Sequence, residues 1–164
     1  MGYVLHGVIG DARVLDGLRH PSMHPTHPLR FGLGVCLVRT DVAADEPPAE
    51  IADELLYLTE PVAGYARELS ERTPVIYVAA DFFGGTGDQA ACGWDGGRLE
   101  LAPLHSHHDE PPCPARGFLR RPRTPTGAID SALAWLGVRR PFRTDRFAAV
   151  GLDERHDWEH ERVR

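Results

Sequence analysis

The chain has 164 residues, of which 42% are hydrophobic and 26% charged, and it carries a formal net charge of −6. This length and hydrophobicity suffice to bury a core, which excludes a disordered protein and predicts one globular domain over residues 1–164. The chain contains no lysine and no asparagine. Enzymes that need a lysine Schiff base, pyridoxal phosphate, a P-loop lysine or a Cys-His-Asn triad are therefore excluded.

Other features disfavour further classes of protein. No apolar run approaches the roughly 18 residues of a membrane helix, and no basic segment precedes an apolar one at the start, so we expect a cytoplasmic protein without a signal peptide. The acidic balance argues against nonspecific binding of nucleic acid. Cys36, Cys92 and Cys113 lack paired spacing, which argues against a disulfide framework or a zinc knuckle, and we expect Cys36 and Cys92 to be buried, inert thiols.

The first seventy residues predict two strands and one helical unit. Residues 3–9 and 31–38 are apolar, β-branched runs that are typical of strands. The three prolines between them predict an irregular loop over residues 19–30. Apolar positions recur every three or four residues over 49–71, which predicts one helix face. Pro61 either kinks this helix or starts a second, nearly coaxial one.

Three more strands are predicted after the helical unit. Residues 73–83 are apolar at odd and even positions alike, which is typical of a central strand buried on both faces. Residues 88–94 and 98–103 form the next two strands, and the Asp-Gly-Gly sequence between them favours a hairpin.

The remaining residues predict a loop, a helix and a tail. The proline-rich segment 103–126 indicates a long loop, and residues 127–137 indicate a short helix that Gly137 ends. The charged residues that follow predict an exposed tail. We therefore expect an α+β fold with a mostly antiparallel sheet of about five strands, whose helices, 49–71 and 128–137, cover one face.

The glycine-rich stretch at 81–89 is the first candidate site. Its glycine spacing matches neither a dinucleotide fingerprint nor a P-loop, and no helix follows, so a connection between adjacent strands is the favoured interpretation. A ligand loop stays open because an acid on a buried strand must be hydrogen-bonded, with Gln89 as one partner for Asp81. The candidate residues are Asp81, Phe83, Gly84, Gly85, Gly87, Asp88 and Gln89.

The stretch from residue 74 to 99, PVIYVAADFFGGTGDQAACGWDGGRL, resembles a pattern found in a group of small actinobacterial proteins without an assigned activity. In that group a second block follows that is similar to residues 129–138, 145–147 and 150–158 of this chain. The resemblance covers about half of the sequence and implies no reaction. Some small proteins of this build look like immunity or partner-binding proteins encoded beside toxins.

Histidines form the second candidate site, since six of the nine lie in two clusters. Imidazoles beside a carboxylate suit zinc or a similar divalent ion. Both clusters are predicted to lie in proline-rich loops, where solvated side chains without a ligand are the favoured interpretation, and a genuine site would draw on both loops. The candidate ligands are His20, His24 and His27 in one cluster and His105, His107, His108 and Asp109 in the other.

Arginines form the third candidate. Residues 111–146 hold eight arginines and two acids, whereas residues 1–110 hold seven arginines and seventeen acids. Such a basic segment on an acidic protein suits an acidic protein partner. The partner-surface candidates are Arg116, Arg120, Arg121, Arg123, Arg139 and Arg140.

Two functions follow from these candidates. The first is a protein that binds an unidentified protein partner, in the manner of an immunity protein, without catalysis and without a cofactor. The second is a small enzyme or metal-binding protein of a biosynthetic pathway that uses the histidine clusters or the glycine-rich stretch from Asp81 to Gln89.

Overall fold

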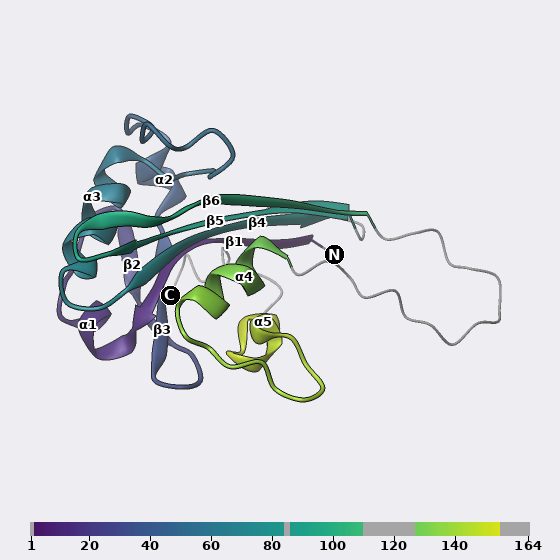
Figure 1. Cartoon of the computed structure of the whole chain (residues 1–164). Helices are drawn as coiled ribbons and strands as arrows, with labels where there is room; N and C mark the ends of the chain where they lie inside the picture. The colour runs from purple at the N-terminus through teal and green to yellow at the C-terminus, as the bar shows by residue number, and fades with distance from the viewer. Residues whose placement is uncertain (1, 84–85, 110–126, 155–164) are drawn as a thin grey trace.

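A computed structural model of the chain describes residues 2–83, 86–109 and 127–154. It contains one six-stranded antiparallel sheet and a few short helices (Figure 1), which confirms the α+β class and the antiparallel sheet. The elements in chain order are β1 (Gly2–Asp11), α1 (Ala12–Asp16), β2 (Met23–Pro28), β3 (Leu33–Val38), α2 (Thr40–Ala43), α3 (Glu60–Ser70), β4 (Val75–Phe83), β5 (Thr86–Asp95), β6 (Arg98–Asp109), α4 (Ala128–Trp135), α5 (Arg146–Ala149) and the 3₁₀ helix η1 (Leu152–Glu154).

The strand order is β2-β3-β1-β4-β5-β6, so β1 and β4 lie at the centre and β2 and β6 form the edges. The strand beyond the predicted five is β2, which occupies part of the segment predicted to be an irregular loop. Pro25 and Pro28 are tolerated there because an edge strand has no second neighbour to which their missing N–H groups would donate.

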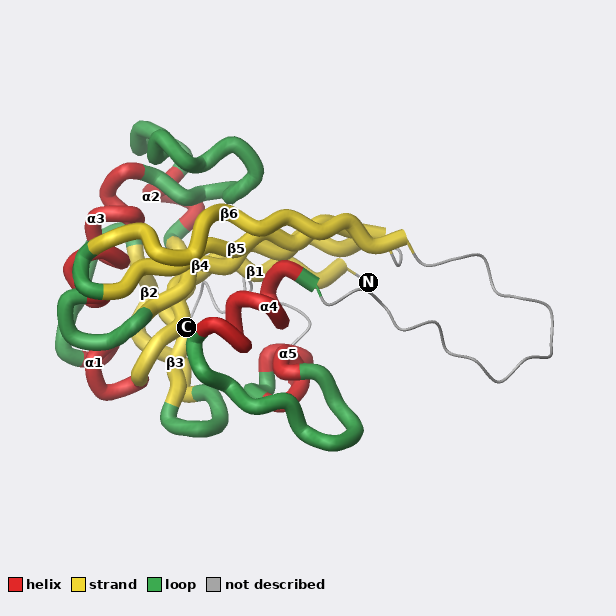
Figure 2. The backbone as a smooth tube through the Cα atoms, in the orientation of Figure 1, coloured by secondary structure: helices red, strands yellow, loops and turns green. Residues whose placement is uncertain are grey.

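Both faces of the sheet carry a hydrophobic core. Figure 2 shows the helices and the sheet that enclose these cores as a backbone trace. Along β4 the side chains of Val75 and Tyr77 belong to the core beneath α3, and those of Ile76 and Val78 belong to the core beneath α4. The burial of this strand on both faces is thus confirmed. The expectation that both helical segments cover one face was wrong, because an apolar strand with two buried faces needs a covering layer on each of them.

Helix α3 is shorter than the predicted helical unit of residues 49–71. It begins at Glu60, with Thr59 as N-cap, whose hydroxyl accepts a hydrogen bond from the N–H of Val62 at 3.3 Å. Pro61 lies in its first turn, as the second predicted arrangement requires. The residues before it form turns, although Leu55 and Leu58 are buried. These leucines have helical spacing in the sequence, but they belong to a loop that packs against the core. Periodicity alone does not distinguish such a loop from a helix.

The hairpin and the last helix follow the sequence prediction. Gly96 and Gly97 have positive φ angles of 58° and 78° and connect β5 to β6 in a two-residue turn, as the Asp-Gly-Gly sequence indicates. Helix α4 has Gly127 as N-cap and ends before Gly137, whose φ is 97°. No helix in the described part of the chain is long and apolar enough to cross a membrane.

Candidate functional site

The glycine-rich stretch connects two neighbouring antiparallel strands, since Phe83 of β4 pairs with Thr86 of β5. Gly84 and Gly85 lie outside the described residues. Gly87 is needed for a close backbone approach, because a Cβ there would lie 2.3 Å from the carbonyl oxygen of Asp81. The stretch therefore matches the interpretation as a strand connection.

Asp81 does not have the environment that we expected from the sequence. Its side chain is exposed near the end of β4, and Phe83 beside it is also exposed. Burial of β4 stops at Ala80, so this carboxylate keeps its hydration and needs no internal hydrogen bond. The expected bond to Gln89 is absent from the described residues.

Gln89 instead points to the opposite face of the sheet, where it caps helix α4. Its Oε1 accepts a hydrogen bond from the N–H of Ile129 at 3.3 Å, and the hydroxyl of Ser106 accepts one from the N–H of Ala128 at 2.9 Å. Because the N-cap residue Gly127 has no side chain, two strands of the sheet supply the acceptors that a capping residue would normally offer. The role of Gln89 in this structure is thus to hold α4.

Asp88 joins two of the predicted histidines in what we call the acid–histidine cluster: Glu54, Asp88, His105 and His107. Oδ1 of Asp88 lies 3.0 Å from Nε2 of His105 and 2.8 Å from Nδ1 of His107. Nδ1 of His105 lies 3.2 Å from Oε2 of Glu54. Each nitrogen of the His105 ring therefore lies beside a carboxylate oxygen. Glu54 lies far from this hairpin in sequence, and no local pattern pointed to it.

The cluster is electrostatically coupled but open to solvent. Hydrogen bonding from His107, with smaller contributions from the nearby imidazole of His105, lowers the pKa of the Asp88 carboxyl below its usual range. The side chains of all four residues are exposed to solvent to a third or more. No group of three or more potential ligands in the described ranges has a geometry that could hold a metal ion.

The two histidine clusters lie on opposite edges of the sheet. His24 and His27 are on β2 and His20 just precedes it, whereas His105, His107 and His108 are on β6. The expectation that both clusters contribute to one site was therefore wrong, as was the assignment to loops of every histidine in them except His20. Even within β6 the set divides, because alternate side chains point to opposite faces: the ring of His108 faces Phe82, with centroids 6.3 Å apart. The side chain of Asp109 lies outside the described residues.

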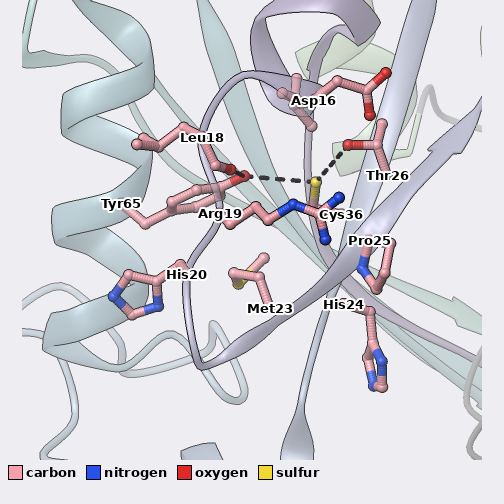
Figure 3. Close-up of a pocket in the computed structure, with 11 residues that line it drawn as sticks. Asp16, Leu18, Arg19, His20, Met23, His24, Pro25, Thr26, Cys36 and Tyr65 are labelled. Carbon is pink, nitrogen blue, oxygen red and sulfur yellow. Dashed lines mark hydrogen bonds between the residues drawn. The ribbon is translucent and has the colours of Figure 1, made fainter.

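His20 and His24 line a cavity of about 190 Å³ beside β2 (Figure 3). Its other walls include Cys36 of β3 and Tyr65 of α3, which are both buried. Cys36 and Cys92 are buried thiols outside any disulfide, as predicted, and burial raises the pKa of Cys92 to about 12. Cys113 lies outside the described residues.

A groove of about 360 Å³ lies where the β2–β3 turn meets the end of α4. We define the phenylalanine–arginine surface as this groove with the exposed residues that follow it. Its residues are Phe31, Leu33, Leu136, Gly137, Val138, Arg139, Arg140 and Phe142.

This surface presents two phenylalanines and two arginines to solvent. Phe31 is 69% exposed and Phe142 is 97% exposed. Arg139 and Arg140 are exposed, as predicted, and form no ion pair with any other described residue. The other predicted partner-surface arginines, Arg116, Arg120, Arg121 and Arg123, lie outside the described ranges. The phenylalanines were missed because a lone aromatic residue in a turn does not reveal its exposure.

Comparisons with family models, with curated proteins and with solved structures return no match for this chain.

Proposed function

We propose that this protein binds an acidic protein partner at the phenylalanine–arginine surface and acts in the cytoplasm by that binding, without catalysis. The observation that carries the proposal is the conjunction of an apolar groove, exposed aromatic side chains and arginines that form no ion pair within the described ranges, all on one stretch of surface. Aromatic residues and arginine are enriched where protein interfaces gain most of their binding energy.

Phe31 is the strongest indication of contact with a partner. Its φ of 62° is in the left-handed region, which costs a non-glycine residue on the order of 1–2 kcal/mol. Its ring is also exposed to water, so the folded protein gains little burial energy from it. A strained backbone that holds an apolar ring in solvent is explained if the ring enters a pocket of another protein.

The charge of the surface indicates the kind of partner. Arg139 and Arg140 stand on a protein whose formal net charge is −6, and neither is neutralised by a described acid. Guanidinium groups without internal partners are available to form bidentate pairs with carboxylates. We therefore expect an acidic binding segment that also carries an apolar side chain, as the partner of an immunity-like protein would.

A double substitution tests this proposal. The full chain and the variant Phe31→Ala/Arg139→Glu are immobilised, and proteins captured from a lysate of the source cells are identified and then produced pure. A partner of this surface binds the wild-type chain with a Kd that rises with salt, and it binds the double variant at least about tenfold more weakly.

The matched control is Phe83→Ala/Arg13→Glu, which changes an exposed phenylalanine and an exposed arginine elsewhere. It should bind the partner like the wild type. Equal binding by the double variant and the wild type, with both folded by circular dichroism, would refute the proposal.

The acid–histidine cluster supports the second candidate function, acid–base chemistry or binding of a divalent metal. The observation in its favour is that Oδ1 of Asp88 lies within 3.0 Å of nitrogens from two histidines. Metal analysis of tag-free protein decides this candidate: stoichiometric zinc that is lost on His105→Ala would replace the partner-binding proposal with a metal-dependent one.

A further inference from the structure

The cavity beside β2 has an interior built from three polar side chains (Figure 3). The sulfur of Cys36 lies 3.3 Å from the hydroxyl oxygen of Thr26 and 3.5 Å from that of Tyr65. The Tyr65 hydroxyl also donates to the carbonyl of Leu18 at 3.2 Å. Burial raises the pKa of Cys36 and of Tyr65, so this wall of the cavity is uncharged at neutral pH.

A count of protons shows that Thr26 keeps hydrogen-bonding capacity. The Tyr65 hydroxyl is the donor to both Leu18 and the sulfur of Cys36, whereas either group can be the donor in the contact between Thr26 and Cys36. If Thr26 donates to the sulfur, it retains its lone pairs, and if the Cys36 thiol donates to Thr26, the hydroxyl retains its own proton. Either arrangement leaves Thr26 able to bond a molecule in the cavity.

Two opposite charges border the same cavity without meeting. Asp16, at the end of α1, and Arg19 both line it, yet they form no ion pair with each other or with any other described residue. The charge of Asp16 is close enough to the interior to raise the pKa of both Cys36 and Tyr65. A ligand in this cavity would therefore have both the carboxylate of Asp16 and the guanidinium of Arg19 available to it.

The remaining lining combines the imidazoles of His20 and His24 with apolar and aromatic side chains. Leu15 and Met23 are buried and contribute hydrocarbon surface, and the rings of His20 and Tyr65 have centroids 5.6 Å apart. The volume of about 190 Å³ holds roughly six water-sized groups. It is smaller than the roughly 300 Å³ at which pockets for drug-sized molecules begin, so only a small guest fits.

We propose that this cavity binds a small zwitterion, namely a free α-amino acid with a short side chain. Asp16 receives the ammonium group, Arg19 receives the carboxylate, and Thr26 bonds whichever group reaches the interior. Leu15 and Met23 contact the short side chain. This ligand site lies on the α3 face of the sheet, whereas the phenylalanine–arginine surface packs with the α4 core, so the inference does not rest on the proposed function.

Titration calorimetry on the full chain tests the inference with matched ligands. Glycine, L-alanine and L-serine are the probes. L-alaninamide lacks the carboxylate, N-acetyl-L-alanine lacks the ammonium, and L-tryptophan exceeds the volume. We expect at least one of the three probes to bind with a Kd below about 10 mM. We expect L-alaninamide, N-acetyl-L-alanine and L-tryptophan to bind at least about tenfold more weakly than that probe.

Variants assign the binding to this cavity. Asp16→Asn and Arg19→Gln should each weaken binding of the best probe by about tenfold or more. Asp53→Asn and Arg13→Gln change exposed residues that do not line the cavity and should leave binding unchanged. Absence of binding by all three probes at about 10 mM, or binding that survives both cavity variants, would overturn the inference.

Discussion

His6 shows how burial determines the charge of a single residue in this protein. Its ring lies on the α3 face of β1, within 4.9 Å of the ring of Tyr57 by centroids. Burial lowers the pKa of His6 to about 4, and the negative charge of Asp81 offsets part of that shift. His6 is therefore neutral in the folded protein throughout the physiological range of pH.

This shift predicts a loss of stability in mild acid. Between pH 6.5 and pH 4 the unfolded chain protonates His6 while the folded protein does not, so the free energy of unfolding falls as the pH falls through this window and then levels off. The full shift, from 6.5 to about 4, corresponds to a loss of about 3 kcal/mol. Urea denaturation at several pH values should show that His6→Leu loses less stability than the wild type between neutral pH and pH 4.

The comparison of the two pH profiles is the control, because other acids titrate equally in both proteins. Parallel profiles for the wild type and His6→Leu would contradict the buried, neutral state of His6.

Helix α4 approaches strand β5 so closely at one point that only glycine fits on the strand. At Gly93 of β5 a Cβ would lie 2.7 Å from Cζ3 of Trp135 and 3.1 Å from Cβ of Leu101. The indole of Trp135 thus uses the space that a side chain on β5 would occupy, which places the end of α4 against the sheet.

Gly93→Ala should therefore destabilise the protein, by about 1–3 kcal/mol, because Trp135 or the strand has to shift. Gly64→Ala is the matched substitution, since Gly64 is in helix α3 and a Cβ there meets only the end of Arg67 at 3.9 Å. That variant should gain about 0.5–1 kcal/mol from helix propensity. Thermal unfolding of both variants checks the pair, and a loss of stability of similar size in both would refute the packing argument at Gly93.

The elements also show what could be predicted from the sequence and what could not. The turn at Gly96 and Gly97, the end of α4 and the two buried faces of β4 follow from local chemistry, and they were predicted. The strand β2 was not, because the tolerance of Pro25 depends on its position at an edge of the sheet. The side of the sheet on which a helix lies depends on the path of its connections, which no local pattern records.

Some residues of the candidate sites could be found from the sequence, and others could not. Charge alone pointed to Arg139 and Arg140 as candidates for a partner surface, and both are exposed. The contact of Asp88 with His105 and His107 required the register of β5 and β6, and the contact with Glu54 required the fold of a distant loop. Asp16 and Arg19 were not singled out, because their relevance arises from a cavity whose walls come from four different elements and their connections.

At the scale of the whole molecule, the two proposed binding sites are separated by the sheet. The cavity belongs to the α3 face, and the groove packs with the core beneath α4. No residue lines both the groove and the cavity.

We therefore expect the two sites to act independently. The variant Phe31→Ala/Arg139→Glu should bind the best amino-acid probe with the Kd of the wild type, within about twofold. Calorimetry measures this directly. A change of Kd by tenfold or more would show that the sheet transmits a change from one face to the other.

The central pairing of β1 with β4 has a consequence for the assembly of the molecule. Among the described strands it is the only ladder between the first half of the sheet, β2-β3-β1, and the second, β4-β5-β6, and it contains eight residue pairs from Gly2↔Phe83 to Ile9↔Ile76. During synthesis on the ribosome, β1 is complete before β4 has been made. The backbone edge of β1 that pairs with β4 therefore has no partner at that stage. The β4 strand of a neighbouring nascent chain offers the same eight pairs. Where nascent chains are crowded, β1 of one chain can therefore pair with β4 of another, and dilution during refolding favours the pairing within one chain.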